Sequence, residues 1–139
     1  MNFTRRETLA LGVGAAAMTV LPFRVYAATT DELIAEFTGG ADMADSGVTL
    51  TAPEIAENGN TVPISVSAPG AESIMVLATG NPTPPVATFT FGSLAASQAA
   101  STRIRLAGTQ DVVAIAKLGD GTFARTSSTV KVTIGGCGG

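Results

Sequence analysis

The sequence predicts an all-β fold, an immunoglobulin-like antiparallel β-sandwich with a short amino-terminal helix and a flexible carboxy-terminal Gly-Gly-Cys-Gly-Gly arm. From residue 48 onward, apolar and polar residues alternate over short segments, which is typical of half-buried strands. Turn residues separate about seven such segments, a spacing that favours a two-layer sandwich. The chain has no tryptophan and no pair of cysteines, two hallmarks of antibody domains, so a small barrel stays open as the alternative.

The amino-terminal segment has the pattern of an export signal. Arg5 and Arg6 form a twin-arginine charged region, an apolar stretch rich in alanine and glycine follows, and Ala27 suits a signal peptidase. We therefore predict a twin-arginine-type signal peptide that is cleaved after Ala27. Thr8 and Ala10 depart from the usual twin-arginine pattern, so the general export route stays open.

The chain thus divides into three parts. We expect a signal peptide over residues 1–27, an immunoglobulin-like domain over residues 28–134 and a flexible arm over residues 135–139. The apolar run of the signal is too short to span a bilayer comfortably, so no membrane anchor is expected. The remaining chain is long enough for one hydrophobic core.

A short helix is predicted at the start of the mature domain. Thr29 and Glu32 have the spacing of a capping box, and acidic residues favour the first turn of a helix. Gly39 and Gly40 should end the helix. Its apolar stripe consists of Leu33, Ile34 and Phe37.

The predicted strands follow in order along the rest of the chain. Pro63 lies inside the second of them, which indicates an edge strand, because proline cannot donate to a ladder. The prolines of residues 81–85 predict a stiff loop, and residues 119–121 predict a tight turn. The expected strands lie at 48–50, 62–67, 73–79, 87–91, 102–106, 111–118, near Phe123 and at 130–134.

Two of these strands are apolar on both faces, at residues 74–78 and 112–116. In a two-layer sandwich the outer face of each sheet should be polar. Either the amino-terminal helix and a loop cover this face, or another protein does. For so small a domain, we expect a partner protein to cover it.

Charge disfavours nucleic acid and anionic membranes as partners. The net charge of −3 becomes about −5 without the signal peptide, and an acidic domain repels polyanions. Arg103 and Arg105 alternate with apolar residues and should share an outward face. They are either solvated arginines or a site that steers an anion or docks a partner.

The residues that are missing exclude several kinds of enzyme. The chain has no histidine, and its one tyrosine, Tyr26, lies in the signal segment. No side chain of the mature domain therefore has an ordinary pKa near neutrality. No cluster of histidine, cysteine and aspartate could hold a metal, and no phosphate-binding loop is present. We therefore expect no catalytic residues, no metal and no cofactor.

The single cysteine, Cys137, lies between two pairs of glycines: Gly135, Gly136, Gly138 and Gly139. Glycine has no side chain to pack, so we expect an exposed thread that carries one nucleophile. Cys137 has no base to activate it, so the chain should be a poor enzyme and a good substrate for another enzyme. One alternative is an exported immunoglobulin-like subunit whose cysteine forms an intermolecular disulfide. Another is an autonomous redox enzyme, although a resolving cysteine is missing.

Residues 130–139, Val-Lys-Val-Thr-Ile-Gly-Gly-Cys-Gly-Gly, resemble the carboxy-terminal signature of the SoxY family, the sulfur-carrier subunits of bacterial thiosulfate oxidation. The likeness extends over essentially the whole mature chain. It includes residues 57–59, 62–63, 80–82, 86–89, 101–107, 109–114 and 120–121.

The resemblance implies a periplasmic carrier with an immunoglobulin-like fold and no cofactor. Cys137 would receive thiosulfate as a thiosulfonate adduct and keep its sulfur attached. A SoxZ-like subunit would complete a heterodimer. The haem c enzyme SoxAX would load the cysteine, the manganese hydrolase SoxB would release sulfate, and in some pathways a sulfane dehydrogenase would oxidise the remaining persulfide.

Overall fold

The computed structural model describes residues 29–135 of the chain. The predicted signal peptide lies outside the described residues. Within residues 29–135 one helix, α2 (Thr30–Thr38), precedes the strands, and no helix of this part is long and apolar enough to cross a membrane. The strands are β1 (Met43–Ala44), β2 (Thr49–Thr51), β3 (Ile55–Ala56), β4 (Val62–Ser67), β5 (Ala71–Ala78), β6 (Pro85–Thr90), β7 (Ala99–Ile104), β8 (Gln110–Leu118) and β9 (Phe123–Val132).

Helix α2 begins with the predicted capping box. The Thr29 amide donates to Glu32 Oε2 over 2.7 Å, and the Glu32 amide donates to Thr29 Oγ1 over 3.3 Å. These two bonds satisfy amides that the first turn of a helix leaves without partners. Gly39 ends the helix with a φ of 65°, a left-handed conformation that glycine adopts without steric cost.

Replacing Thr29 with alanine should destabilise the protein by about 1 kcal/mol, because the Glu32 amide loses its acceptor. Thermal or urea unfolding of the mature domain measures the change. Thr83, which is exposed in the loop before β6, provides the control. The Thr83→Ala variant should stay within about 0.5 kcal/mol of the unmodified domain, and an equal loss in both variants would contradict the capping role.

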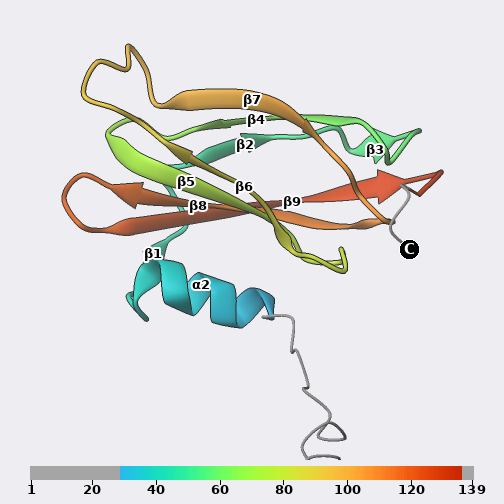
Figure 1. Cartoon of the computed structure of the whole chain (residues 1–139), viewed down its shortest axis with the longest axis horizontal. Helices are drawn as coiled ribbons and strands as arrows, with labels where there is room; N and C mark the ends of the chain where they lie inside the picture. The colour runs from blue at the N-terminus through green and yellow to red at the C-terminus, as the bar shows by residue number, and fades with distance from the viewer. Residues whose placement is uncertain (1–28, 136–139) are drawn as a thin grey trace, which may run out of the picture.

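The strands form two sheets that pack face to face (Figure 1). The larger has six strands, in the order β1-β9-β8-β5-β6 with β3 also paired to β9, and the smaller has the order β2-β4-β7. The predicted two-layer sandwich is confirmed, and its assignment to the immunoglobulin-like class stays a prediction. The prediction of wholly antiparallel sheets is wrong, because the two-residue strands β1 and β3 pair with β9 in parallel.

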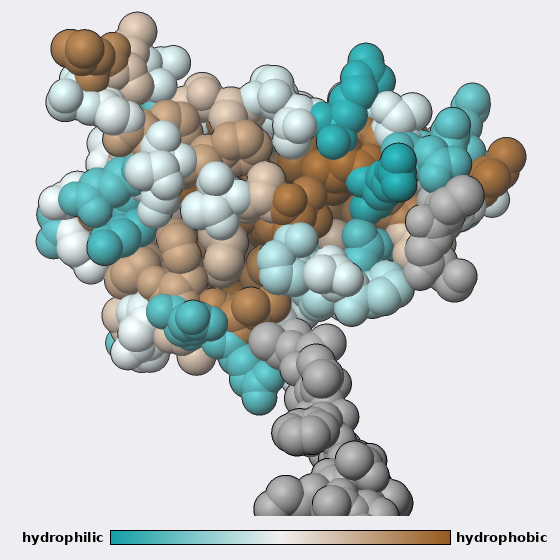
Figure 2. Space-filling view, in the orientation of Figure 1, coloured by the Kyte–Doolittle hydropathy of each residue, from teal (hydrophilic) through white to brown (hydrophobic). Residues whose placement is uncertain are grey.

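The main core lies between the two sheets. Alternate residues of each strand point inward, so the predicted pattern of Val62, Ile64 and Val66 is confirmed by their burial. Figure 2 shows that apolar surface also gathers in the middle of the visible face, in the region of β6. The largest fully buried side chains of this core are Ile74, Leu106, Val62, Val66, Val76, Val112 and Val130.

A second apolar cluster lies on the outer face of the larger sheet, between that sheet and α2, which is drawn below the sheet in Figure 1. Ile34 of the helix packs against it, and the rings of Phe37 and Phe123 meet edge to face with centroids 5.9 Å apart. The prediction that a partner protein covers this face is wrong for these residues. The helix covers them instead, because its apolar stripe matches the outward residues Met75, Leu77, Val113 and Ile115.

Two other expectations about the strands need correction. The strand with Pro63 is not an edge strand, since β4 lies between β2 and β7. β2 pairs only with Ser65–Ser67, so Pro63 has a neighbouring strand, β7, on one side only. Proline is tolerated at such a position because no second strand needs its missing amide hydrogen. The strands expected near Phe123 and at 130–134 are one continuous strand, β9, and Ile134 lies beyond it, 67% exposed.

The β8–β9 hairpin turns through residues 119–122. The Thr122 hydroxyl and the Thr122 amide both donate hydrogen bonds to Asp120 Oδ1. These bonds, the hydroxyl bond more than the amide bond, lower the pKa of the Asp120 carboxyl below its ordinary value. A lowered folded-state pKa stabilises the fold above the unfolded-state pKa, and the stabilisation is lost as pH falls through the folded value. Since Asp120 is fully exposed, solvent screens this effect.

Candidate functional site

The structure places the start of the predicted arm at one end of the sandwich. Gly136, Cys137, Gly138 and Gly139 lie outside the described residues, whereas Gly135 is the last residue described. Strand β9 leads to this end, where β3 also lies (Figure 1). We call residues 133–135 the arm root. Its geometry determines where the chain leaves the domain.

Backbone hydrogen bonds hold the arm root against the segment that contains β3. The Thr133 amide donates to the Ala56 carbonyl over 3.0 Å, and the Thr133 hydroxyl donates to the Glu57 carbonyl over 3.0 Å. The buried Gly59 then donates its amide to the Ile134 carbonyl over 2.8 Å. These bonds continue the parallel pairing of β3 with β9 for two residues past the end of the strand.

Gly135 lies against the backbone of a second segment. A Cβ atom at this position would lie 2.5 Å from the carbonyl oxygen of Ala107, closer than side-chain carbons approach oxygen. No larger residue fits without a shift of the backbone. Glycine is therefore required here for close approach, in addition to any role in the arm.

The segment that Gly135 touches, residues 105–108, is itself held by side-chain amides, and we call it the seat. Asn81 Oδ1 accepts from the Ala107 amide over 2.9 Å, and Asn81 Nδ2 donates to the Arg105 carbonyl over 2.8 Å. Gln110 Nε2 donates to Asn81 Oδ1 over 2.8 Å and to the Gly108 carbonyl over 3.0 Å. Two amide side chains thus fix the backbone on both sides of Ala107.

The seat is also anchored to the core and to the arm root. Leu106 is fully buried, and its amide donates to the Gly59 carbonyl over 2.8 Å. Gly59 therefore bridges the two segments, with its amide on Ile134 and its carbonyl on Leu106. Buried hydrogen bonds of this kind are costly to break, because an unpaired buried group loses its hydration. The arm root and the seat form one connected structure.

Sequence reasoning missed the residues that build the seat. The sequence predicts a stiff loop around Asn81, and the strand that it predicts near Gln110 begins one residue later, at Asp111. Both occur in the stretches that resemble the SoxY family, and a buried glutamine, here 8% exposed, needs hydrogen-bond partners. That need could have indicated a structural role for Gln110, but not its partners.

The two arginines predicted to share an outward face are both exposed. Arg103 Nη1 donates to Thr61 Oγ1 over 3.5 Å, a long bond at the surface. Arg105 gives its carbonyl to Asn81 and so belongs to the seat. Whether either arginine steers an anion stays a prediction.

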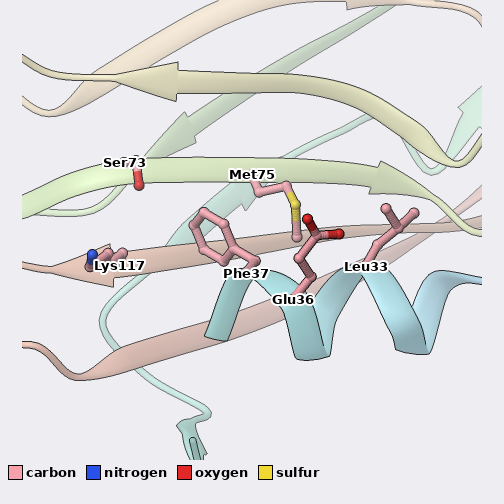
Figure 3. Close-up of a pocket in the computed structure, with 6 residues that line it drawn as sticks. All are labelled: Leu33, Glu36, Phe37, Ser73, Met75 and Lys117. Carbon is pink, nitrogen blue, oxygen red and sulfur yellow. The ribbon is translucent and has the colours of Figure 1, made fainter. Parts of the chain in front are cut away.

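A groove of about 410 Å³ lies elsewhere on the domain, between α2 and the outer face of the larger sheet. Figure 3 shows Phe37, Glu36 and Leu33 of α2 facing Met75 of β5. Lys117 also lines it, and its Nζ lies 3.8 Å from Glu72 Oε2. Lys117 pairs with Phe123 at the start of β9, so this groove and the arm root lie toward opposite ends of that strand.

No group of three or more histidine, cysteine, aspartate or glutamate side chains that could hold a metal ion occurs within residues 29–135. In the same residues, every buried side-chain nitrogen or oxygen has a hydrogen-bond partner. The described part of the domain therefore offers neither a metal centre nor an orphaned polar group for a ligand.

The chain matches a known protein family and several solved structures. The family described as "Sulfur oxidation protein SoxY" matches residues 34–137. The structure of the sulfur carrier protein SoxY from Chlorobium limicola f thiosulfatophilum is 36% identical, with a TM-score of 0.66, and the match covers 78% of this chain and all of that one. No curated protein matches.

A second solved structure shares the fold alone. The superoxide reductase (neelaredoxin) from Ignicoccus hospitalis is 19% identical, with a TM-score of 0.54, over 75% of this chain and 93% of that one. The SoxY structure is more similar than this reductase in both sequence identity and TM-score, and the family match extends through the arm root to Cys137. On these grounds the chain belongs to the SoxY family of sulfur oxidation proteins.

Proposed function

We propose that the chain is a periplasmic sulfur carrier, which binds thiosulfate-derived sulfur covalently on Cys137 and presents it to the enzymes of thiosulfate oxidation. The observation that carries this proposal is that the family match extends to Cys137 itself. The similar Chlorobium protein is described as a sulfur carrier. The arm root supports the proposal, because it delivers the chain to one end of a stable domain.

The proposed loading reaction is an oxidation. The Cys137 sulfur and the sulfane sulfur of thiosulfate form an S–S bond, the thiol loses its proton, and two electrons leave. The haem c enzyme SoxAX would accept these electrons. This chain has no histidine, and residues 29–135 offer no metal site, so the oxidant comes from the partner in this proposal.

Later steps are likewise assigned to partners. The manganese hydrolase SoxB would attack the terminal sulfone and release sulfate, which leaves a persulfide on Cys137. A sulfane dehydrogenase would oxidise that persulfide in some pathways. A SoxZ-like subunit would complete the carrier as a heterodimer, and the twin-arginine-type signal would export the chain. The immunoglobulin-like sandwich would serve as a scaffold for the arm.

Mass spectrometry of the loaded carrier tests the proposal. The mature chain with its SoxZ-like partner is incubated with thiosulfate and the haem c enzyme, and peptides are mapped. We expect a sulfur-containing adduct on the peptide with Cys137 and on no other peptide, and reductant should remove it. Sulfate in place of thiosulfate is the control, because it has no sulfane sulfur.

Two outcomes would contradict the proposal. An unmodified carboxy-terminal peptide under turnover conditions would show that Cys137 does not receive sulfur. A stoichiometric disulfide-linked dimer that persists in the presence of thiosulfate and the haem c enzyme would favour the alternative, an interaction subunit joined through its cysteine.

A further inference from the structure

The arm root is held at three successive residues, although all three are exposed. Thr133 and Ile134 are fixed by hydrogen bonds to the segment around β3, and Gly135 lies against the Ala107 carbonyl. Any motion of the root would have to break these contacts together. The domain therefore defines the position of Gly135 closely.

The fixed root limits where the sulfur can be presented. From Gly135 to Cys137 the chain spans two residues, or at most about 7 Å at ~3.3–3.6 Å per residue. If the chain were free from the end of β9 at Val132, the span would be five residues and at most about 18 Å. Since the region that Cys137 can reach is small, the direction set by the root decides how the thiol enters a partner enzyme.

We propose that the seat is a positioning device for the carrier: Asn81 and Gly135 together fix the point from which Cys137 is presented to its partner enzymes. Asn81 holds the Ala107 amide and the Arg105 carbonyl, and Gly135 allows the root to lie on the seat. Both act through the backbone and neither touches the sulfur. This inference rests on the proposed carrier function.

Gly135→Ala is the sharpest test, because its Cβ must displace the root from Ala107. With the intact heterodimer, we expect kcat/KM for loading by the haem c enzyme to fall by at least about tenfold, since small misplacements of reacting groups cost that much or more. The reaction of Cys137 with iodoacetamide should stay within about twofold, because a small reagent needs no fixed approach.

Gly92→Ala is the matched control. A Cβ at Gly92 would meet no atom within 4 Å, so this variant makes the same chemical change without a clash. It should load at the rate of the unmodified carrier. Thermal unfolding of both variants checks that the domain remains folded at the assay temperature.

Substitution of Asn81 tests the seat independently of Gly135. Asn81→Ala removes the side chain that holds Ala107, and we expect a similar fall in loading. Asn81→Asp keeps the acceptor for the Ala107 amide and should recover part of the rate. In the double variant with Gly135→Ala the two effects should be less than additive, because both disturb the position of Gly135 on Ala107.

The outcomes separate this inference from the proposed function. Absence of an adduct in the unmodified carrier would contradict the function itself. If the unmodified carrier loads and Gly135→Ala loads equally fast, the seat has no positioning role. A parallel fall in alkylation would also overturn the inference, since it would show that the thiol's own accessibility had changed. Strictly additive effects of Asn81→Ala and Gly135→Ala on loading would also overturn the inference.

Discussion

Cys137→Ser is expected to abolish sulfur loading completely while leaving the fold unchanged. A serine hydroxyl cannot form the S–S bond with thiosulfate, and the chain has no second cysteine to replace it. The stability of the domain should stay within about 0.5 kcal/mol, because the glycines on both sides of Cys137 predict a position outside the hydrophobic core. Peptide mass mapping and thermal unfolding of the same preparation measure both quantities.

A relocated thiol provides the control for this experiment. Ser97→Cys in the Cys137→Ser background places a thiol on an exposed loop between β6 and β7. It should react with iodoacetamide but not be loaded by the haem c enzyme, because loading requires presentation at the end of the chain. Enzymatic loading of this relocated cysteine would show that any exposed thiol suffices.

Ile34→Asp is expected to cause the largest loss of stability, at least about 3 kcal/mol, because it buries a charge without a partner. Ile34 is 7% exposed and lies in the cluster between α2 and the larger sheet. When the helix detaches, the apolar residues Leu77, Val113 and Ile115 become exposed to water. We expect hydrophobic dye to bind and the domain to self-associate, as measured by fluorescence and light scattering.

Ala35→Asp distinguishes loss of packing from loss of helix propensity. Ala35 is exposed on the same helix, so the aspartate there remains solvated. The cost should be well below about 1 kcal/mol, with no dye binding. If both variants bound dye equally, the cover provided by α2 would be too weak to protect the outer face, and a partner protein would again be needed there.

The sequence predicted α2 and most strands because each has a strong local signal. The capping box and glycine stop determine α2, and alternation in β4 marks its buried face. The strands β1 and β3 were missed because a two-residue segment is too short to show an alternation of apolar and polar residues. Both strands are defined only by their pairing with β9. The central place of β4 was missed for a related reason, since the length of a neighbouring strand such as β2 is not encoded locally.

The candidate site divides in the same way. Cys137 and its glycines are recognisable from composition and from their resemblance to a family signature. The seat is not, because Asn81, Ala107 and Gly135 are distant in sequence and meet only after the two sheets have packed. The cover of the outer face was only partly predictable. The apolar stripe of the helix is evident in the sequence, but the sequence leaves open whether the helix or a partner protein covers that face.

The length of β9 has a mechanical consequence for a carrier. In the proposed function, a partner enzyme that holds Cys137 while the two proteins separate would pull on β9 through the arm root. Its eight residue pairs with β8 make hydrogen bonds perpendicular to that direction, so they bear the load in shear and must rupture together. If the force acted across the strand instead of along it, the hydrogen bonds would break one at a time. For a carrier of this kind, the long pairing of β8 with β9 would resist repeated pulling on the carboxy-terminal end of the domain.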